Sequence, residues 1–185
     1  MNIKDVAERI NELAADYKMA EFQAIRKSLK ELQRMASRKI FTSQSIFVSY
    51  GYAFHWGGRK EIQYNIWEVR EGFRYGLAFS LSTSQTLPDI SIFEPKIKRF
   101  NEFMGRHSHR FSDMELLYYP PGQDLGKRIE IIDPGLIQRD AFILFGKCLP
   151  KSLDQLTAQD YTKILETFDK LLEVYRYVEG DSSVI

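Results

Sequence analysis

The sequence predicts an α+β fold, in which a mainly antiparallel sheet of about five or six strands is combined with helices. Apolar residues recur at three- and four-residue steps through the first part of the chain, which is the spacing of one helix face. From Ser45 to Leu81 the sequence changes to aromatic and β-branched stretches separated by glycine, which favours strands and tight turns. Helical spacing returns near the end of the chain.

Two helices are predicted before the sheet, and no glycine or proline interrupts residues 1–50. The apolar face of the first helix is formed by Ile3, Val6, Ile10, Leu13 and Tyr17. The apolar face of the second helix is formed by Phe22, Ile25, Leu29 and Leu32. We therefore assign residues 1–40 to a helical segment that packs on the sheet.

The strand-rich region begins with three predicted strands, at residues 46–54, 61–69 and 73–81. Turn-forming glycines separate these strands, which indicates an antiparallel meander. An inserted helix is expected at residues 93–104, and a final helix at 157–178 with Thr157 as its N-cap. Further strands are expected at residues 114–119, 129–132 and 141–147. Residues 41–180 then form one α+β recognition domain, and residues 181–185 a tail or the start of a linker.

The composition favours a soluble, cytoplasmic globular chain. The 185 residues are 44% hydrophobic, with 26 Lys and Arg against 25 Asp and Glu, which excludes a disordered chain. The single Cys148 cannot pair within the chain, so no disulfide framework is expected. No apolar run is long enough to cross a bilayer, and the charged N-terminal segment does not have the pattern of a signal peptide.

Positive charge is concentrated on the predicted second helix, although the net charge of the chain is only +1. Arg26, Lys30 and Arg34 lie at four-residue steps and form a basic ridge beside the apolar face. Such a ridge suits the phosphates of a polyanion, and it is equally typical of a solvated helix face.

Catalytic motifs are weak. Asp89, Glu94 and Lys96 resemble the acid–acid–lysine signature of metal-dependent nucleases, but the acids are closely spaced and Pro95 disfavours strand pairing between them. His107 and His109 are better explained as part of a basic loop than as metal ligands, because further ligands are missing nearby. No phosphate-binding loop or nucleophile elbow is present. We therefore expect a non-catalytic module without metal or cofactor.

Aromatic, amide and basic residues gather between Tyr50 and Trp67. Aromatic faces hold planar groups, amides read their edges and cations bind phosphates, so this combination is typical of a base-binding site. An aromatic-rich core is the alternative explanation. The candidate base-binding pocket consists of Tyr52, Trp56, Tyr64, Trp67 and Tyr118. The candidate phosphate-binding residues are Arg26, Lys30, Arg34, Arg59 and Lys60.

The run Ser49-Tyr50-Gly51-Tyr52, followed by Trp56, resembles a segment in the N-terminal DNA-recognition domain of McrB-type modification-dependent restriction proteins. Asp160-Tyr161-Thr162 at the start of the last helix and the order of elements are also similar. The resemblance implies a domain that binds double-stranded DNA and flips a modified base into an aromatic pocket. Of the five candidate pocket residues, only Tyr52 and Trp56 correspond directly to the segment of that family. We add Tyr64, Trp67 and Tyr118 to the pocket from strand alternation.

The sequence thus predicts the specificity domain of a restriction or antiviral defence system, which binds double-stranded DNA and no membrane. A nuclease or NTPase subunit or domain would be its working partner. Two alternatives remain, namely a small metal-dependent nuclease that uses Asp89, Glu94 and Lys96, and a protein-interaction module.

Overall fold

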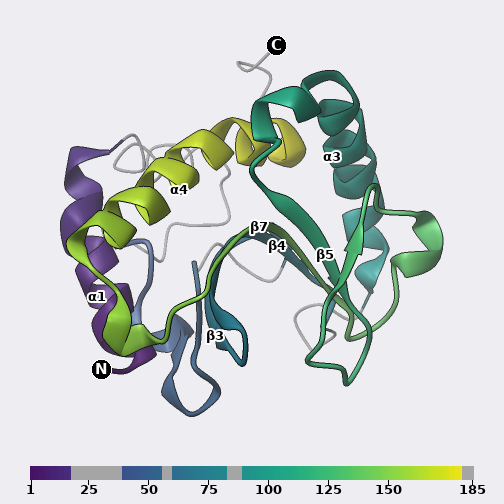
Figure 1. Ribbon diagram of the computed structural model, residues 1–185. Coiled ribbons are helices and arrows are strands. Elements are labelled where there is room, and N and C mark those ends of the chain that lie inside the picture. The colour runs from purple at the N-terminus through teal and green to yellow at the C-terminus, as the bar shows by residue number, and fades with distance from the viewer. Residues whose placement is uncertain (18–38, 56–59, 83–88, 181–185) are drawn as a thin grey trace.

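The computed structural model describes residues 1–17, 39–55, 60–82 and 89–180. Within these ranges the fold is α+β, with three α-helices and one seven-stranded antiparallel sheet (Figure 1). The helices are α1 (Ile3–Leu13), α3 (Glu94–His107) and α4 (Ala158–Glu179). The strands are β1 (Ile46–Phe47), β2 (Tyr52–Phe54), β3 (Gln63–Val69), β4 (Gly72–Ser80), β5 (Glu115–Tyr119), β6 (Lys127–Ile129) and β7 (Phe142–Leu149).

The sheet has the strand order β1-β2-β3-β4-β7-β5-β6, and every pairing is antiparallel. The predicted first strand is in fact two short strands, because a single 3₁₀ turn (Val48–Tyr50) and Gly51 interrupt it. Gly51 has a φ of +57°, a left-handed conformation that glycine adopts without strain. This interruption explains why the sheet has seven strands instead of the five or six predicted. β7 lies between β4 and β5 and pairs with both. Only the first four strands therefore form the predicted antiparallel meander.

Helix boundaries follow from local capping. Asn2 caps α1 through the backbone N–H groups of Lys4 and Asp5. Thr157 caps α4 as predicted, and Gly180, in the left-handed region, ends it. The predicted second helix lies outside the described residues, together with its basic residues Arg26, Lys30 and Arg34.

One face of the sheet is covered by helices, and this side holds the main hydrophobic core. Alternate residues of the central strands point into it, among them Tyr64, Tyr75 and Phe145, and they pack against apolar residues of all three helices. α1 and α3 lie over opposite ends of the sheet, and α4 runs from beside α1 to beside α3 (Figure 1). The opposite face carries no helix among the described residues.

The sheet is strongly curled, with the helices on its outer side and the helix-free face on its inner side (Figure 1). Gly76 and Gly146 face each other in the β4–β7 ladder, where a Cβ on either would lie within about 2.2 Å of a backbone oxygen of the other strand. Trp67 is paired with Arg74, and Phe142 with Ser80, six residues further along β4. In a flat sheet that step would separate them by about 20 Å. Their ring centroids are only 6.0 Å apart, so the curl brings the two ends of the sheet together.

Candidate functional site

A cluster of six aromatic side chains lies on the helix-free face of the sheet. Each ring has its centroid between 5.4 and 6.3 Å from that of at least one neighbour in the cluster. The cluster is formed by Phe47, Tyr52, Phe54, Trp67, Tyr119 and Phe142. These rings come from five different strands, so the curled sheet as a whole assembles the cluster.

Three cavities with common walls run over this cluster, and together we name them the aromatic groove. The middle cavity, of about 160 Å³, is lined only by Tyr50, Tyr52, Trp67 and Phe142. The second cavity, of about 280 Å³, adds polar groups at one end of the groove, and it is lined by Phe47, Tyr50, Tyr52, Phe54, Gln63, Ser80 and Ser82. The third cavity, of about 580 Å³, is lined by Tyr50, Trp67, Glu68, Val69, Arg70, Glu71, Asp124 and Leu125. The groove therefore passes from a polar end, through an aromatic middle, to a charged end.

Tyr50 lines all three cavities, and its side chain is the most exposed of the large hydrophobic ones described, at 74%. It projects from the 3₁₀ turn between β1 and β2, immediately before Gly51. The carbonyl of Gly51 accepts a hydrogen bond from the N–H of Glu68 at 2.8 Å, which ties the turn to β3. A Cβ at position 51 would lie 3.1 Å from the Cβ of Glu68. Glycine at position 51 thus lets the turn present Tyr50 close against the sheet.

Below the rings, the same face carries buried polar groups. Arg74 is 9% exposed, and its guanidinium carbon lies 5.4 Å from the ring centroid of Tyr119. One terminal nitrogen of Arg74 forms an ion pair of 3.7 Å with the half-exposed carboxylate of Glu71. Asn65, on the neighbouring strand β3, donates a long hydrogen bond of 3.4 Å to the carbonyl of Gln63. Buried polar groups therefore lie beside the aromatic cluster on the same face of the sheet.

The structure brings together two of the five residues predicted for the base pocket. Tyr52 and Trp67 lie on the groove side, with ring centroids 6.3 Å apart. Tyr64 and Tyr118 lie on the other face, in the core beneath the helices, because strand alternation turns them away from Trp67 and Tyr119 respectively. Trp56 lies outside the described residues. Tyr64 and Tyr118 therefore do not line the groove.

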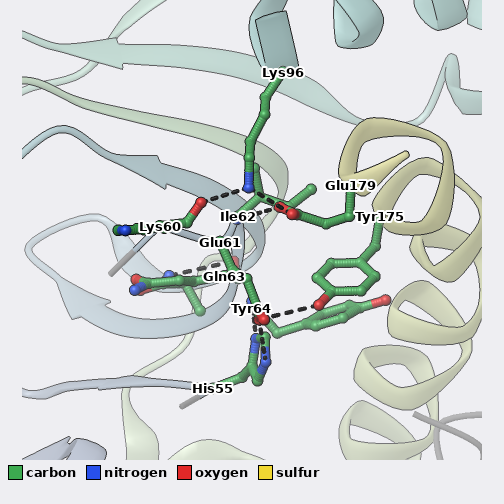
Figure 2. Close-up of polar contacts among 10 residues, drawn as sticks. His55, Lys60, Glu61, Ile62, Gln63, Tyr64, Lys96, Tyr175 and Glu179 are labelled. Carbon is green, nitrogen blue, oxygen red and sulfur yellow. Dashed lines mark hydrogen bonds and ion pairs between the residues drawn. The ribbon is translucent and has the colours of Figure 1, made fainter. Parts of the chain in front are cut away.

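The predicted phosphate-binding residues lie largely outside the described residues. This holds for Arg26, Lys30, Arg34 and Arg59. Lys60 is described and exposed, and its carbonyl oxygen accepts a hydrogen bond from the ammonium of Lys96 (Figure 2). The side chain of Lys60 is thus accessible to a ligand, while its backbone is fixed.

A buried polar network holds both flanks of residues 56–59 against α4 (Figure 2). His55 and Glu61 are buried, with Nε2 of His55 3.5 Å from Oε2 of Glu61. The same carboxylate oxygen accepts a hydrogen bond of 3.1 Å from the hydroxyl of Tyr175 on α4. Glu179, one helical turn later, accepts from the N–H of Ile62 at 2.8 Å. The described residues on both sides of 56–59 are thus anchored to α4.

The same network includes Lys96, one of the residues of the nuclease alternative. Its ammonium forms an ion pair with Glu179, and both side chains are largely buried (Figure 2). Asp89 caps a 3₁₀ turn, and its hydrogen bonds with Ser91 lower the pKa of its carboxyl group. Among the described residues, no group of three or more His, Cys, Asp or Glu side chains is arranged to hold a metal ion.

Asp113 and Cys148 also have surroundings that suit a structural role. Asp113, near His109, forms ion pairs with Lys147 and Lys170, and the hydrogen bond from Lys147 lowers the pKa of the carboxyl group. Cys148 is half-buried beside Arg74 in the β4–β7 ladder, and burial raises the pKa of its thiol. A raised thiol pKa disfavours the reactive thiolate.

Sequence reasoning missed several residues of the groove. Tyr50, Phe47, Phe54 and Phe142 line it, and Arg74 and Tyr119 lie beneath it, but none of them was in the predicted pocket. Alternation within β7 and β5 marks Phe142 and Tyr119 as facing away from the core. Their distance from Trp67 depends on the curl, for which the sequence offers only the two glycines as a signal.

No protein-family model, curated protein or solved structure matches this chain. None of the helices in the described ranges has the length and apolar character that crossing a membrane requires.

Proposed function

We propose that the aromatic groove holds a nucleobase and that the protein is a non-catalytic DNA-recognition module of a restriction or antiviral defence system. One observation carries this proposal, namely a cavity lined only by Tyr50, Tyr52, Trp67 and Phe142. Aromatic rings on several sides suit a flat heterocycle, whose faces stack on them. A flipped or modified base is such a group, and it meets polar side chains only at its edge.

The polar end of the groove is a second observation that supports the proposal. Gln63, Ser80 and Ser82 line the cavity that continues from the aromatic middle. An amide and two hydroxyls are able to donate and accept hydrogen bonds, which is what discrimination between bases requires. We assign phosphate contacts to the exposed Lys60 and, outside the described residues, to Arg59, Arg26, Lys30 and Arg34.

The experiment is a gel-shift and titration series with duplexes that contain unmodified, 5-methylcytosine or N6-methyladenine sites. Replacing Tyr50 with alanine is expected to weaken binding by about 1 to 3 kcal/mol, the usual value of one base–aromatic stack. It should also reduce the discrimination between modified and plain sites. Because Tyr50 is largely exposed, the free energy of unfolding should change by less than about 0.5 kcal/mol.

Ile131→Ala is the matched control, since Ile131 is also an exposed apolar residue and does not line the groove. Its DNA affinity should equal that of the wild type. Lys60→Ala should weaken binding to all duplexes alike and lower the salt dependence by about one unit. DNA affinity that is the same in Tyr50→Ala and in the wild type would remove the proposed role of the groove.

The charged end of the groove favours a second candidate function, that of a protein-interaction module. Glu68, Glu71 and Asp124 outnumber Arg70 there, which suits a basic partner better than a phosphate. Salt titration separates the two functions, because nucleic-acid binding releases counterions and weakens steeply with salt. Absence of binding to every duplex, together with capture of a basic peptide, would favour the second function.

A further inference from the structure

Four unsatisfied polar atoms lie on the helix-free face of the sheet, close to the aromatic cluster. Among the described residues, Nε and Nη1 of Arg74, Oδ1 of Asn65 and the hydroxyl of Tyr119 are buried and have no hydrogen-bond partner. All three residues are on the helix-free face, where Asn65 and Arg74 belong to the paired strands β3 and β4. Buried polar atoms are nearly always paired, so a group of unpaired ones in one place requires an explanation.

The charge of Arg74 is also poorly compensated. Its one ion pair, with Glu71, measures 3.7 Å, and that carboxylate is half exposed. The ring of Tyr119 covers the guanidinium and offers only a cation–π contact. A buried guanidinium ordinarily meets a carboxylate, a phosphate or several carbonyl oxygens. An oxygen acceptor from a ligand would supply what this site lacks.

The ring of Tyr119 is in a position to cover Arg74. Its ring is in contact with Trp67, which lines the aromatic middle of the groove, at a centroid distance of 5.4 Å. The ring also packs against Gly126, where a Cβ would lie 2.6 Å from Cζ of Tyr119. The tyrosine is 2% exposed, and its own hydroxyl is one of the unpaired atoms. Rotation of Tyr119 would release its hydroxyl to water and open Arg74 to the groove.

We propose that Arg74 is a ligand-binding residue of the aromatic groove, which donates hydrogen bonds to an oxygen acceptor on the planar occupant, and that Tyr119 covers it while the groove is empty. The inference rests on the proposed function, because it takes the occupant to be a nucleobase or nucleotide. The acceptor is a carbonyl oxygen of the base or an oxygen of its phosphate. Asn65, through its free Oδ1, accepts from an N–H of the same occupant.

The test is calorimetric titration of the full chain with three kinds of probe: nucleoside 5′-monophosphates, the corresponding nucleosides, and inorganic phosphate. Equal binding of nucleoside and monophosphate would assign the acceptor to the base. Binding of monophosphate and inorganic phosphate without nucleoside would assign it to the phosphate. Either result supports the proposal if the binding depends on Arg74.

Dependence on Arg74 is measured with Arg74→Met, which keeps the length of the side chain and removes every donor. We expect at least tenfold weaker binding, with a thermal midpoint that is unchanged or raised because unpaired buried donors are removed. Arg9→Met on α1 is the matched control, and its affinity should equal that of the wild type. If Arg74→Met does not fold, Arg74→Lys replaces it, with the same tenfold loss expected.

Wild-type affinity in both Arg74 variants would overturn the inference, and so would failure of the wild type to bind any of the three probes. A lowered midpoint with unchanged affinity would show that Arg74 is only structural. The gel shift decides the proposed function separately. DNA binding that survives in Arg74→Met with full discrimination refutes this inference and leaves the proposed function standing.

Discussion

The two faces of the sheet are both rich in aromatic residues, yet they differ in almost every other respect. On the helix-covered face, Tyr64 is fully buried and its hydroxyl donates to the carbonyl of Phe168 at 3.1 Å. Burial raises the pKa of this hydroxyl well above its usual value. On the helix-free face, Tyr50 is exposed and Tyr119 is buried without a hydrogen-bond partner among the described residues.

This difference shows that aromatic content alone does not mark a binding surface. Aromatic residues on the helix side contribute packing, and the hydroxyls of the buried Tyr64 and Tyr175 have hydrogen-bond partners. Those on the other side form walls around open space and enclose polar atoms that lack partners. Hydrogen-bond satisfaction therefore distinguishes the candidate site from the core.

Alanine substitutions on the two faces are expected to have different effects. Tyr64→Ala is expected to lower the free energy of unfolding by about 3 to 5 kcal/mol, since it removes a fully buried ring from the core. Trp67→Ala, on the groove side, should cost less stability because the side chain is partly exposed, and it should instead weaken DNA binding. Chemical denaturation and a titration on each folded variant measure both effects. Equal destabilisation without any binding loss would place Trp67 in the core.

On the helix-covered side, loss of a buried ion-pair partner should destabilise the fold. Lys96→Met leaves the buried carboxylate of Glu179 without its ion pair, which should cost about 3 kcal/mol. Glu179 also holds the N–H of Ile62, so hydrogen exchange at the start of β3 should accelerate. Cleavage of DNA by the wild type that Lys96→Met and Asp89→Ala both abolish would instead support the nuclease alternative.

The capping box of α4 gives the helix side a pH dependence. Hydrogen bonding from Lys151, with further bonds from the backbone and hydroxyl of Thr157, lowers the pKa of Asp160 from 3.8 to about 2. Because the folded-state pKa is the lower one, Asp160 stabilises the fold above pH 3.8, and this contribution disappears as the pH falls to about 2. Asp160→Asn should therefore cost about 2 kcal/mol at neutral pH and much less at pH 2, where about half of the Asp160 carboxyl groups are protonated. Chemical denaturation of the wild type and the variant at both pH values measures this loss. An equal loss in the free energy of unfolding at the two pH values would contradict the prediction.

Removal of a single tyrosine hydroxyl should have opposite effects on the two faces. Tyr64→Phe removes a hydroxyl that is hydrogen-bonded and should cost about 1 kcal/mol. Tyr119→Phe removes a buried hydroxyl that has no partner, so the free energy of unfolding should stay unchanged or rise by up to about 1 kcal/mol. A loss in Tyr119→Phe as large as that in Tyr64→Phe would show that the Tyr119 hydroxyl has a partner after all.

Much of the fold follows from local patterns in the sequence. Apolar spacing places α1, α3 and α4 to within a few residues, and Thr157 caps α4 as its position before an apolar run indicates. Alternation within β3 assigns Tyr64 to one face and Trp67 to the other. The sequence does not reveal which of the two faces the helices cover, since both carry large aromatic rings.

By itself, then, the sequence determined the element types, the α+β class and the aromatic character of the strand-rich region, because these depend on residue spacing and local conformational preference. Only the tertiary structure decided the site. Insertion of β7 between β4 and β5 and the curl of the sheet bring Phe142 and Tyr119 against Trp67, from positions far apart in the chain. The helices then bury Tyr64 and Tyr118, while no helix of the described residues covers the opposite face. Contacts of this kind arise from long-range packing, which no local pattern encodes.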